Sequence, residues 1–262
     1  MPEESVIYVG DQAHVPYGPR PLEQVRVFSE GITRFLISKG TKIIVVACNS
    51  ASAAALTFLR ENFPGDQFVG MEPAIKPAAE TTTTGVVGVL ATPATFQGAL
   101  FGSVVERFAS GVELLRSTCP GLVERIEAGD LAGPQTVAIL REALQPMLVR
   151  HIDTVVLACT HYPFVIPAIQ VIVGDQVRVI DPAPAVALQT MRLLEAKGLR
   201  SASRGVGESE FLTSGDPDRL TRLLPQLLGA SAAVRALAWL DDRRLSETPA
   251  APSAMVRQGH PG

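Results

Sequence analysis

The feature that most constrains this chain is a short unit that occurs twice: an apolar run, then alanine, cysteine and two polar residues. The first copy is residues 42–51 (KIIVVACNSA) and the second is residues 154–164 (TVVLACTHYPF). Apolar runs of this length are typical of parallel strands buried on both faces, and each cysteine falls where its strand should end. Ligands of open α/β sheets bind at the carboxyl ends of the strands. We therefore expect Cys48 and Cys159 at a functional site.

The rest of the chain alternates between strand-like and helix-like segments, which predicts an α/β fold with mostly parallel sheets. The expected strands are 6–9, 43–47, 68–70, 86–91, 112–115, 154–158, 176–180 and 211–216. The expected helices are 21–39, 51–62, 95–108, 135–149, 163–173, 184–197 and 217–228. Asn49 or Ser50 is the expected N-cap of the second helix. Since the two cysteine units lie in different segments, we predict two similar α/β domains with the active site in the cleft between them.

The composition along the chain suggests where the domains begin and end. We expect a first domain over residues 1–75 plus 182–230 and a second over residues 76–181. The boundary rests on a polar run, TTTTG at 81–85, which predicts a structureless link. Residues 231–262 are expected to form a C-terminal extension. Its end is rich in Pro, Ala, Ser and Gly, so we expect disorder from about residue 246.

Bulk composition narrows the functional classes. The chain has 262 residues, 47% hydrophobic and 19% charged, and a net charge of −3. This balance argues against a broad nucleic-acid or anionic-membrane surface. Apolar runs stay below the roughly 18 residues of a membrane span, and the N-terminus does not resemble a signal peptide, so we expect a cytoplasmic protein. The three cysteines form no CxxC pair, so we expect no metal site.

Two thiols that face each other suit one type of reaction. A thiol has a reference pKa of about 8.5 and can act as acid or base once its surroundings adjust it. A thiolate can remove a proton from a carbon while the opposite thiol returns one from the other side, so the carbon is inverted without a cofactor. Asn49, Ser50 and Thr160 are placed to donate hydrogen bonds to a substrate carboxylate. Asp11 and His161 are candidates to adjust the thiols.

Structural interpretations compete with this one. A lone buried cysteine is usually a small hydrophobic residue, and we expect this role for Cys119. His161 could cap a helix, and Asp11 could be a turn residue. A cysteine hydrolase that uses Cys159 and His161 is another alternative, but it would need an oxyanion hole and leaves Cys48 unexplained.

Three motifs together carry a family resemblance: 10–18 (GDQAHVPYG), 46–52 (VACNSAS) and 157–163 (LACTHYP). They resemble the glutamate racemases of the aspartate/glutamate racemase family. The segments 92–95 (TPAT), 119–120 (CP) and 211–217 (FLTSGDP) fit the same family. The resemblance runs in order from about residue 5 to residue 229, and it is most specific where the two cysteine motifs combine with the Pro-Tyr-Gly loop.

The resemblance implies a cofactor-independent racemase that interconverts L- and D-glutamate and supplies D-glutamate for peptidoglycan. It implies that Cys48 and Cys159 are the acid/base pair, assisted by Asp11, Glu127 and His161. The substrate-binding positions that it implies are Tyr17, Gly18, Asn49, Ser50, Thr92, Thr160 and His161. A racemase for aspartate and an inactive member with a binding role stay open as alternatives, and a homodimer is one assembly to test.

The chain departs from the family pattern in two places. Ser50 stands where threonine is usual, which keeps the hydroxyl. The family also normally begins with a strand, an Asp-Ser-Gly-x-Gly-Gly turn and a helix ahead of the part that matches residues 6–11. The Asp-Ser pair would bind the substrate ammonium, and loss of the strand should expose an apolar sheet edge. We expect either a start codon assigned too late or a truncated, weakly active form. The DNA upstream of Met1 would decide between them.

Overall fold

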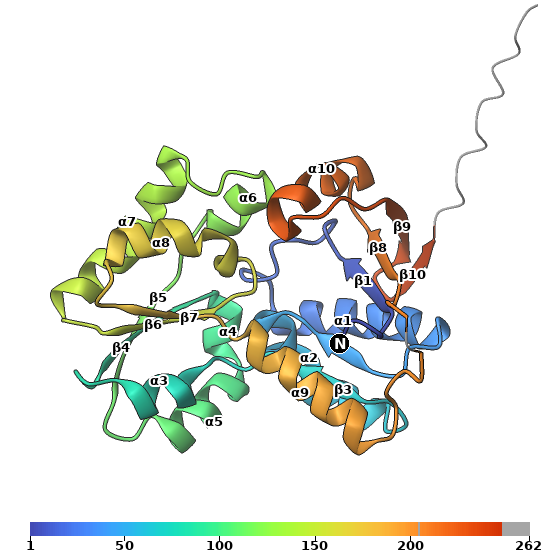
Figure 1. Ribbon diagram of the computed structural model, residues 1–262, viewed down its shortest axis with the longest axis horizontal. Coiled ribbons are helices and arrows are strands. Elements are labelled where there is room, and N and C mark those ends of the chain that lie inside the picture. Colours follow the sequence, from blue (N-terminus) through green and yellow to red (C-terminus); the bar gives the residue numbers. More distant parts are fainter. Residues whose placement is uncertain (204, 248–262) are drawn as a thin grey trace, which may run out of the picture.

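In the computed structural model, which describes residues 1–203 and 205–247, the middle of the chain builds one four-stranded parallel sheet in the order β5-β4-β6-β7 (Figure 1). Its strands are β4 (Val86–Ala91), β5 (Glu113–Ser117), β6 (Thr154–Ala158) and β7 (Arg178–Ile180). Its helices are α3 (Ile75–Thr81), α4 (Pro93–Gln97), α5 (Ala99–Phe108), α6 (Leu122–Glu127), α7 (Pro134–Val149) and α8 (Ile166–Val173), with a 3₁₀ turn at Tyr162–Val165.

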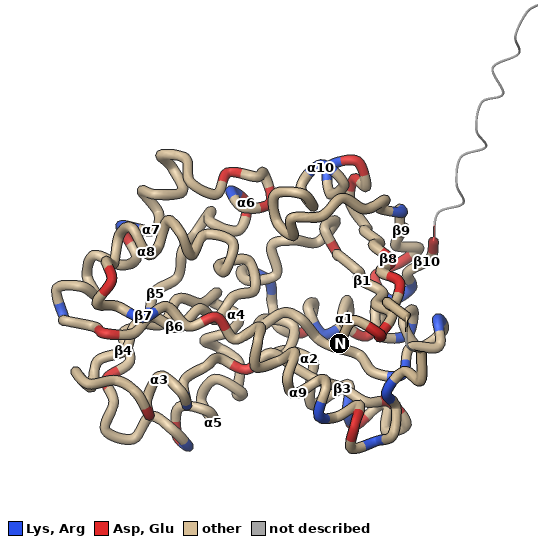
Figure 2. Tube along the Cα trace, in the orientation of Figure 1, with Lys and Arg blue, Asp and Glu red and all other residues tan. Residues whose placement is uncertain are grey.

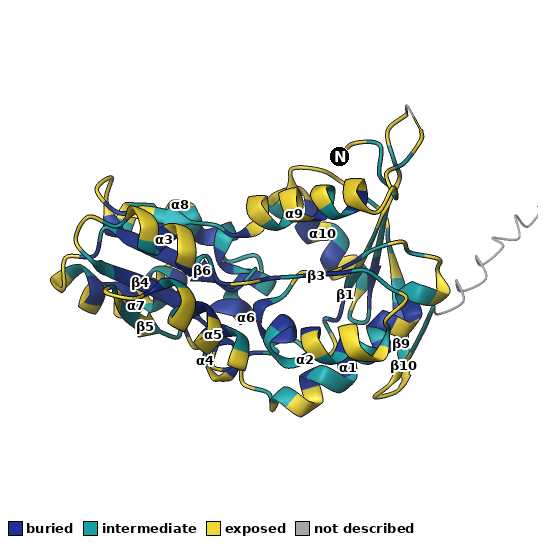
Figure 3. Cartoon of the chain, turned by 90° about the horizontal axis from the view of Figure 1, so that it is seen from below, coloured by how far each residue is buried: buried dark blue, intermediate teal, exposed yellow. Residues whose placement is uncertain are grey.

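Strand β6 is central in this sheet, and every residue in it is buried. Apolar side chains cover both faces, as expected for a parallel strand. Leu144 of α7 and Ile169 of α8 belong to the core cluster on one face, while Ile75 of α3 and Phe101 of α5 belong to a second cluster. In Figure 3 the strands of this half are dark and the outer faces of its helices are exposed. This layering fixes the carboxyl end of β6, where Cys159 follows.

The other half combines segments from the two ends of the chain. A four-stranded sheet has the order β1-β8-β9-β10, in which only the β9–β10 pair is antiparallel. A separate parallel pair joins β2 and β3. The strands are β1 (Val6–Gly10), β2 (Ile44–Val46), β3 (Phe68–Gly70), β8 (Ser209–Thr213), β9 (Val234–Asp241) and β10 (Arg244–Glu247). The helices are α1 (Leu22–Ser38), α2 (Asn49–Asn62), α9 (Ala183–Ala196) and α10 (Pro217–Leu228).

Strands β1 and β2 are not hydrogen-bonded neighbours, and both line a cavity that separates the two sheets of this half. Apolar side chains of these strands are exposed as a result: Val6 is 52% exposed, and Tyr8 and Val45 are also exposed.

The C-terminal segment corrects the predicted extension over 231–262. Strand β9 pairs with β8 and so continues the first sheet, and β10 folds back against it. Tertiary packing explains this, because Leu237 is buried against Phe35 and Leu212. Ser246 and Glu247 lie in β10, where disorder was expected to begin. The remainder of that prediction, residues 248–262, lies outside the described residues.

Two further local predictions need correction. The threonine run is not structureless, because Thr81 ends α3 and the side chains of Thr82 and Thr83 donate to the Asp153 carboxylate, each at 2.8 Å. The helix expected over 95–108 is divided into α4 and α5 at Gly98, whose backbone is extended. Helix α6 was not predicted, and it carries Glu127 into the cleft.

Positions of positively and negatively charged residues are mixed along the trace of both halves (Figure 2). Many form ion pairs along one helix or between neighbouring strands, such as Arg34 with Glu30 and Arg235 with Glu247. Among the described residues, no helix is both long enough and apolar enough to span a membrane.

Candidate active site

The cavity that β1 and β2 line continues to the place where the two halves meet, and its whole volume is about 530 Å³, within the range of small-molecule sites. Cys48 reaches it from the end of β2 and Cys159 from the end of β6, so the two thiol units that the sequence singled out share one cavity. Tyr17, Gly18, Asn49, Ser50, Thr92, Glu127, Thr160 and His161 also line it. These predicted site residues are thus brought together from five separate segments.

Cys48 is half-buried and is itself the N-cap of α2. Its Sγ accepts a hydrogen bond from the Ala51 backbone N–H at 3.4 Å. The expected caps, Asn49 and Ser50, instead lie in the first turn of the helix. Burial raises the pKa of the Cys48 thiol to about 11, although the Ala51 N–H opposes the rise and the nearby Cys159 adds to it. Cys48 is therefore a protonated thiol at neutral pH.

Cys159 has ionisable neighbours. Its Sγ lies 4.0 Å from His161 Nδ1, and His161 Nε2 lies 2.8 Å from Glu127 Oε1. Gln12 Nε2 donates to the other Glu127 oxygen at 2.7 Å. Burial alone would lower the pKa of His161, but Cys159 and Glu127 outweigh it and raise the pKa to about 10. Burial likewise works to raise the pKa of Glu127, yet the His161 ring holds it below the usual value. His161 therefore carries a positive charge beside Cys159 at neutral pH.

Direct contacts across the cleft hold the two thiol units together. Ser50 Oγ and Thr92 Oγ1 are 2.8 Å apart, and Thr160 Oγ1 donates to the Ala47 carbonyl at 3.2 Å. Each contact links a residue beside one cysteine to the opposite half. The Ala94 N–H, at the start of α4, donates to the Gly18 carbonyl at 3.0 Å. The walls of the cavity are therefore set by both halves at once.

Asn49 stands out on the cavity wall. It is only 2% exposed, and among the described residues neither its Oδ1 nor its Nδ2 has a hydrogen-bond partner. A buried amide without partners is costly and is rare in folded proteins. Because Asn49 lines the cavity next to Cys48, its side chain is available to a bound polar ligand.

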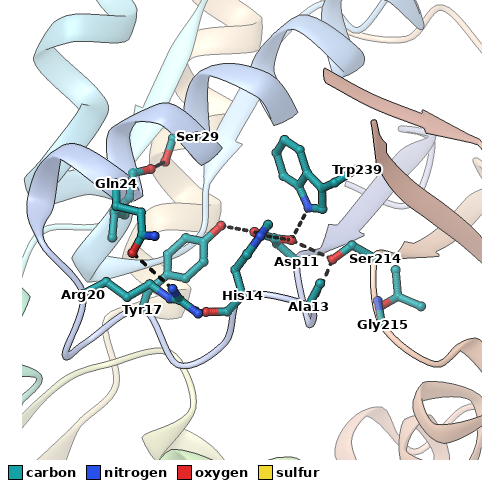
Figure 4. A network of polar contacts seen from close by, with 12 residues as sticks. Asp11, Ala13, His14, Tyr17, Arg20, Gln24, Ser29, Ser214, Gly215 and Trp239 are labelled. Carbon is teal, nitrogen blue, oxygen red and sulfur yellow. Dashed lines mark hydrogen bonds and ion pairs between the residues drawn. The ribbon is translucent and has the colours of Figure 1, made fainter. Parts of the chain in front are cut away.

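The Asp11 carboxylate is surrounded by donors rather than by thiols (Figure 4). It accepts from Tyr17 Oη, Ser214 Oγ and Trp239 Nε1 at 2.5, 2.6 and 2.7 Å, and His14 Nδ1 lies 2.9 Å away. Within residues 1–203 and 205–247, neither cysteine is among its hydrogen-bond partners. This geometry ties Asp11 to the Pro-Tyr-Gly loop more directly than to Cys48.

Cys119 is buried in the core cluster that also contains Tyr162. Burial, together with the nearby Cys159, raises the pKa of its thiol to about 12, and Tyr162 partly opposes the rise. Cys119 also reaches the cavity wall, but its surroundings are mainly apolar, as its predicted packing role requires. Groups of three or more His, Cys, Asp or Glu side chains that could hold a metal ion are absent from the described residues.

Four residues around the site were not predicted from the sequence. Gln12 supports Glu127, while His14, Ser214 and Trp239 hold Asp11. The neighbours of Gln12 and Ser214 in the motifs GDQ and TSGD could have drawn attention to them. Trp239 gave no such signal, because it lies in a segment that was expected to form an extension.

Comparisons with known proteins agree with this geometry. The Asp/Glu/Hydantoin racemase family model matches residues 1–190. The chain belongs to this racemase family. A curated glutamate racemase of Pseudomonas aeruginosa (strain UCBPP-PA14) is 49% identical to this racemase over 234 residues, which cover 89% of this chain and 88% of the relative.

Solved structures show the same architecture. Glutamate racemase of Escherichia coli, in complex with L-glutamate and the activator UDP-MurNAc-ala, is 29% identical with a TM-score of 0.76 and covers 90% of this chain and 89% of its own. Glutamate racemase of Francisella tularensis, in complex with D-glutamate, is 25% identical with a TM-score of 0.78. The match covers 91% of this chain and 88% of that structure. The predicted α/β fold with mostly parallel sheets is confirmed, and the chain is an amino-acid racemase that acts on a small molecule.

Proposed function

We propose that this racemase interconverts L- and D-glutamate by proton transfer between Cys48 and Cys159 on opposite faces of the substrate. The observation that carries the proposal is that two thiols, each at the carboxyl end of a strand and each from a different half, line one cavity. Relatives named as glutamate racemases, with either glutamate enantiomer bound in solved structures, support the choice of substrate.

The surroundings of the thiols support a division of roles. The positive charge on His161 lies 4.0 Å from the Cys159 sulfur and stabilises negative charge there, while Cys48 stays protonated. The Cys159 thiolate then takes the α-proton of one enantiomer, which breaks the C–H bond and leaves an electron pair on the α-carbon. The Cys48 S–H bond breaks as its proton joins that pair from the opposite face. The reverse direction exchanges the roles, and no electron is gained or lost overall.

Charge that develops on the substrate carboxylate needs hydrogen-bond donors. We propose that the Asn49 amide, which is buried without partners, binds this carboxylate together with the hydroxyls of Ser50 and Thr92, and that the Thr160 hydroxyl turns from the Ala47 carbonyl to join them when substrate is bound. Tyr17 and Gly18 close the cavity from the loop side. Glu127 assists by fixing the orientation and charge of His161. We include Asp11 as an assisting residue through its bond to Tyr17.

The cellular setting is part of the same proposal. Its product, D-glutamate, would supply bacterial peptidoglycan. The three free thiols suit the reducing cytoplasm. We also propose a homodimer, and size-exclusion chromatography with light scattering would distinguish a dimer from the 27.8 kDa monomer.

The decisive experiment incubates the purified chain with L-glutamate in heavy water. Circular dichroism follows inversion, and mass spectrometry follows deuterium at the α-carbon. We expect Cys48→Ala and Cys159→Ala each to lower the inversion rate by at least about 10³-fold, within the range of general acid–base catalysis.

The matched control is Cys119→Ala, which removes the third thiol and should keep most of the activity. Normal inversion by either Cys48→Ala or Cys159→Ala would refute the two-base mechanism. A parent chain that binds glutamate without exchange or inversion would instead favour a binding role.

A further inference from the structure

The Asp11 carboxylate joins three distant parts of the chain (Figure 4). Tyr17 and His14 belong to the loop of residues 12–20, Ser214 follows β8, and Trp239 lies in β9. Their four polar groups surround a carboxylate whose residue is only 8% exposed. A buried carboxylate with several donors has a fixed orientation, because rotation would break more than one charge-assisted hydrogen bond.

Trp239 is built into this arrangement by packing as well as by its N–H group. Its indole lies against the rings of Phe28 and His14, with centroids 5.8 and 5.2 Å away. Helix α1 has glycine at position 31, where a Cβ atom would approach the indole to 2.7 Å. Because Gly31 has no side chain, the indole can occupy this space. In that position its Nε1 donates a hydrogen bond to Asp11.

The connection continues from Asp11 to the cavity wall. Asp11 Oδ2 accepts from the Tyr17 hydroxyl, and the next residue, Gly18, accepts from the Ala94 N–H across the cleft. Gly18 also packs closely on Thr92, since a Cβ at Gly18 would lie 2.7 Å from the Thr92 Cβ. The position of the loop over the substrate cavity thus depends on Asp11, whose other oxygen is held by Trp239.

We propose that Trp239 is a positioning residue that sets substrate affinity by holding Asp11, and through it Tyr17 and Gly18, against the cavity. We call this arrangement of Trp239, Asp11 and Tyr17 the clamp. The inference rests on the proposed glutamate racemase function for its substrate, but the clamp itself does not depend on that function. It assigns the C-terminal strand β9 a role in the site although no β9 residue lines the cavity.

The main test is Trp239→Phe, which keeps an aromatic ring beside Phe28 and removes the N–H donor. We expect KM for glutamate to rise about five- to tenfold while kcat stays within about twofold, because ground-state and transition-state binding weaken together. In a chain that already carries Tyr17→Phe, adding Trp239→Phe should raise KM by less than about twofold, since both substitutions act through Asp11. Full additivity of the two effects would contradict the proposal.

The matched control is Leu237→Val, in the same strand. Leu237 is buried against Phe35 and makes no hydrogen bond to Asp11. We expect this variant to lower Tm without changing KM. An equal rise of KM in both variants, following the loss of Tm, would show that β9 acts through stability alone and would overturn the proposal.

Hydrogen–deuterium exchange of the substrate-free chain separates the clamp from the proposed function. In Trp239→Phe, amides of residues 12–20 should exchange at least about fivefold faster, and those of β4 and β6 should not change. Unchanged exchange in the loop would refute the clamp whatever the activity. Faster exchange in a chain that fails to racemise glutamate would sustain the clamp and refute the proposed substrate.

Discussion

At the scale of single residues, the two thiols differ in what surrounds them. Cys48 has neutral neighbours, a backbone N–H and the Ser50 hydroxyl group, whereas Cys159 lies beside the His161–Glu127 ion pair. Environments that move the pKa values of two ionisable groups apart are a general guide to which group acts as acid and which as base. The asymmetry arises because α2 begins at Cys48, whereas α6, which lies in the same half as Cys159, carries Glu127 to the His161 side chain.

The His161–Glu127 pair gives a pH-dependent prediction for stability. Because the pKa of His161 is raised from 6.5 to about 10, its contribution should be full below about pH 6.5 and lost as pH rises through about 10. The lowered pKa of Glu127 means that the contribution is also lost in acid, below about pH 4.5. The side chains are 25% and 19% exposed, so we expect about 2 kcal/mol, between surface and buried pairs.

The measurement is urea unfolding of the chain and of His161→Gln at about pH 6 and about pH 10. The stability difference should fall by more than half at the higher pH. His151→Asn, at an exposed position whose left-handed backbone asparagine also tolerates, is the control and should show the same small difference at both pH values. A His161→Gln deficit that is equal at both pH values would contradict the assigned charge.

At the scale of elements, the main liability is the pair of strands that flank the cavity. Strands β1 and β2 do not pair with each other, and the side chains of Val6, Tyr8 and Val45 are exposed to solvent. Unpaired apolar edges promote association between chains, since they expose a row of backbone donors and acceptors. In contrast, β4 and β6 have partners on both sides and are buried.

We expect Val6→Thr to reduce aggregation at high concentration, because it keeps a β-branched residue in β1 and removes exposed apolar surface. Its Tm should stay within about 2 °C of the parent, as is usual for surface substitutions. Light scattering over time measures the effect. The control is Val149→Thr, at a valine that is 68% exposed but ends a helix, and it should leave aggregation unchanged. Equal benefit from both substitutions would show that hydrophobicity alone, rather than the strand edge, causes association.

At the scale of the whole molecule, the shape of the cavity depends on how the two halves meet. The contacts between Ser50 and Thr92, between Thr160 and Ala47, and between Ala94 and Gly18 all cross the cleft. Each involves a residue that lines the cavity or adjoins one that does. A small change in the approach of the halves would therefore alter the substrate site before it affected either core.

Gly18→Ala tests this dependence. The new Cβ would lie 2.7 Å from the Thr92 Cβ, so the loop must move away and weaken the Ala94–Gly18 hydrogen bond. We expect KM for glutamate to rise about tenfold with a Tm loss of a few degrees. Steady-state kinetics with thermal unfolding would measure both.

The matched control is Gly102→Ala, in the middle of α5, where a Cβ meets no neighbour within 4 Å. It should keep KM and stabilise the chain by about 0.5–1 kcal/mol, since glycine is unfavourable inside helices. An unchanged KM in Gly18→Ala would mean that the loop does not need its close approach to Thr92.

The alternation of strands and helices, the two thiol units and the polar residues that follow them could be predicted from the sequence. Those signals are local, because a run such as TVVLA has to be buried on both faces and a cysteine after it has to lie at the strand end. Helix α6 and the division at Gly98 were missed, since short segments have weak periodicity. The N-cap was misplaced by one residue or two because the sulfur of Cys48 took the role usually filled by oxygen.

By itself, the sequence determined the class of fold, the pair Cys48 and Cys159 and the racemase family, because these depend on residue types at short spacing. Only the tertiary structure decided which groups surround each thiol. It placed Glu127 on His161, turned Asp11 toward Tyr17 and Trp239, and made β9 part of the first sheet. These contacts join residues far apart in the chain, and their energies depend on burial and geometry that local patterns do not encode.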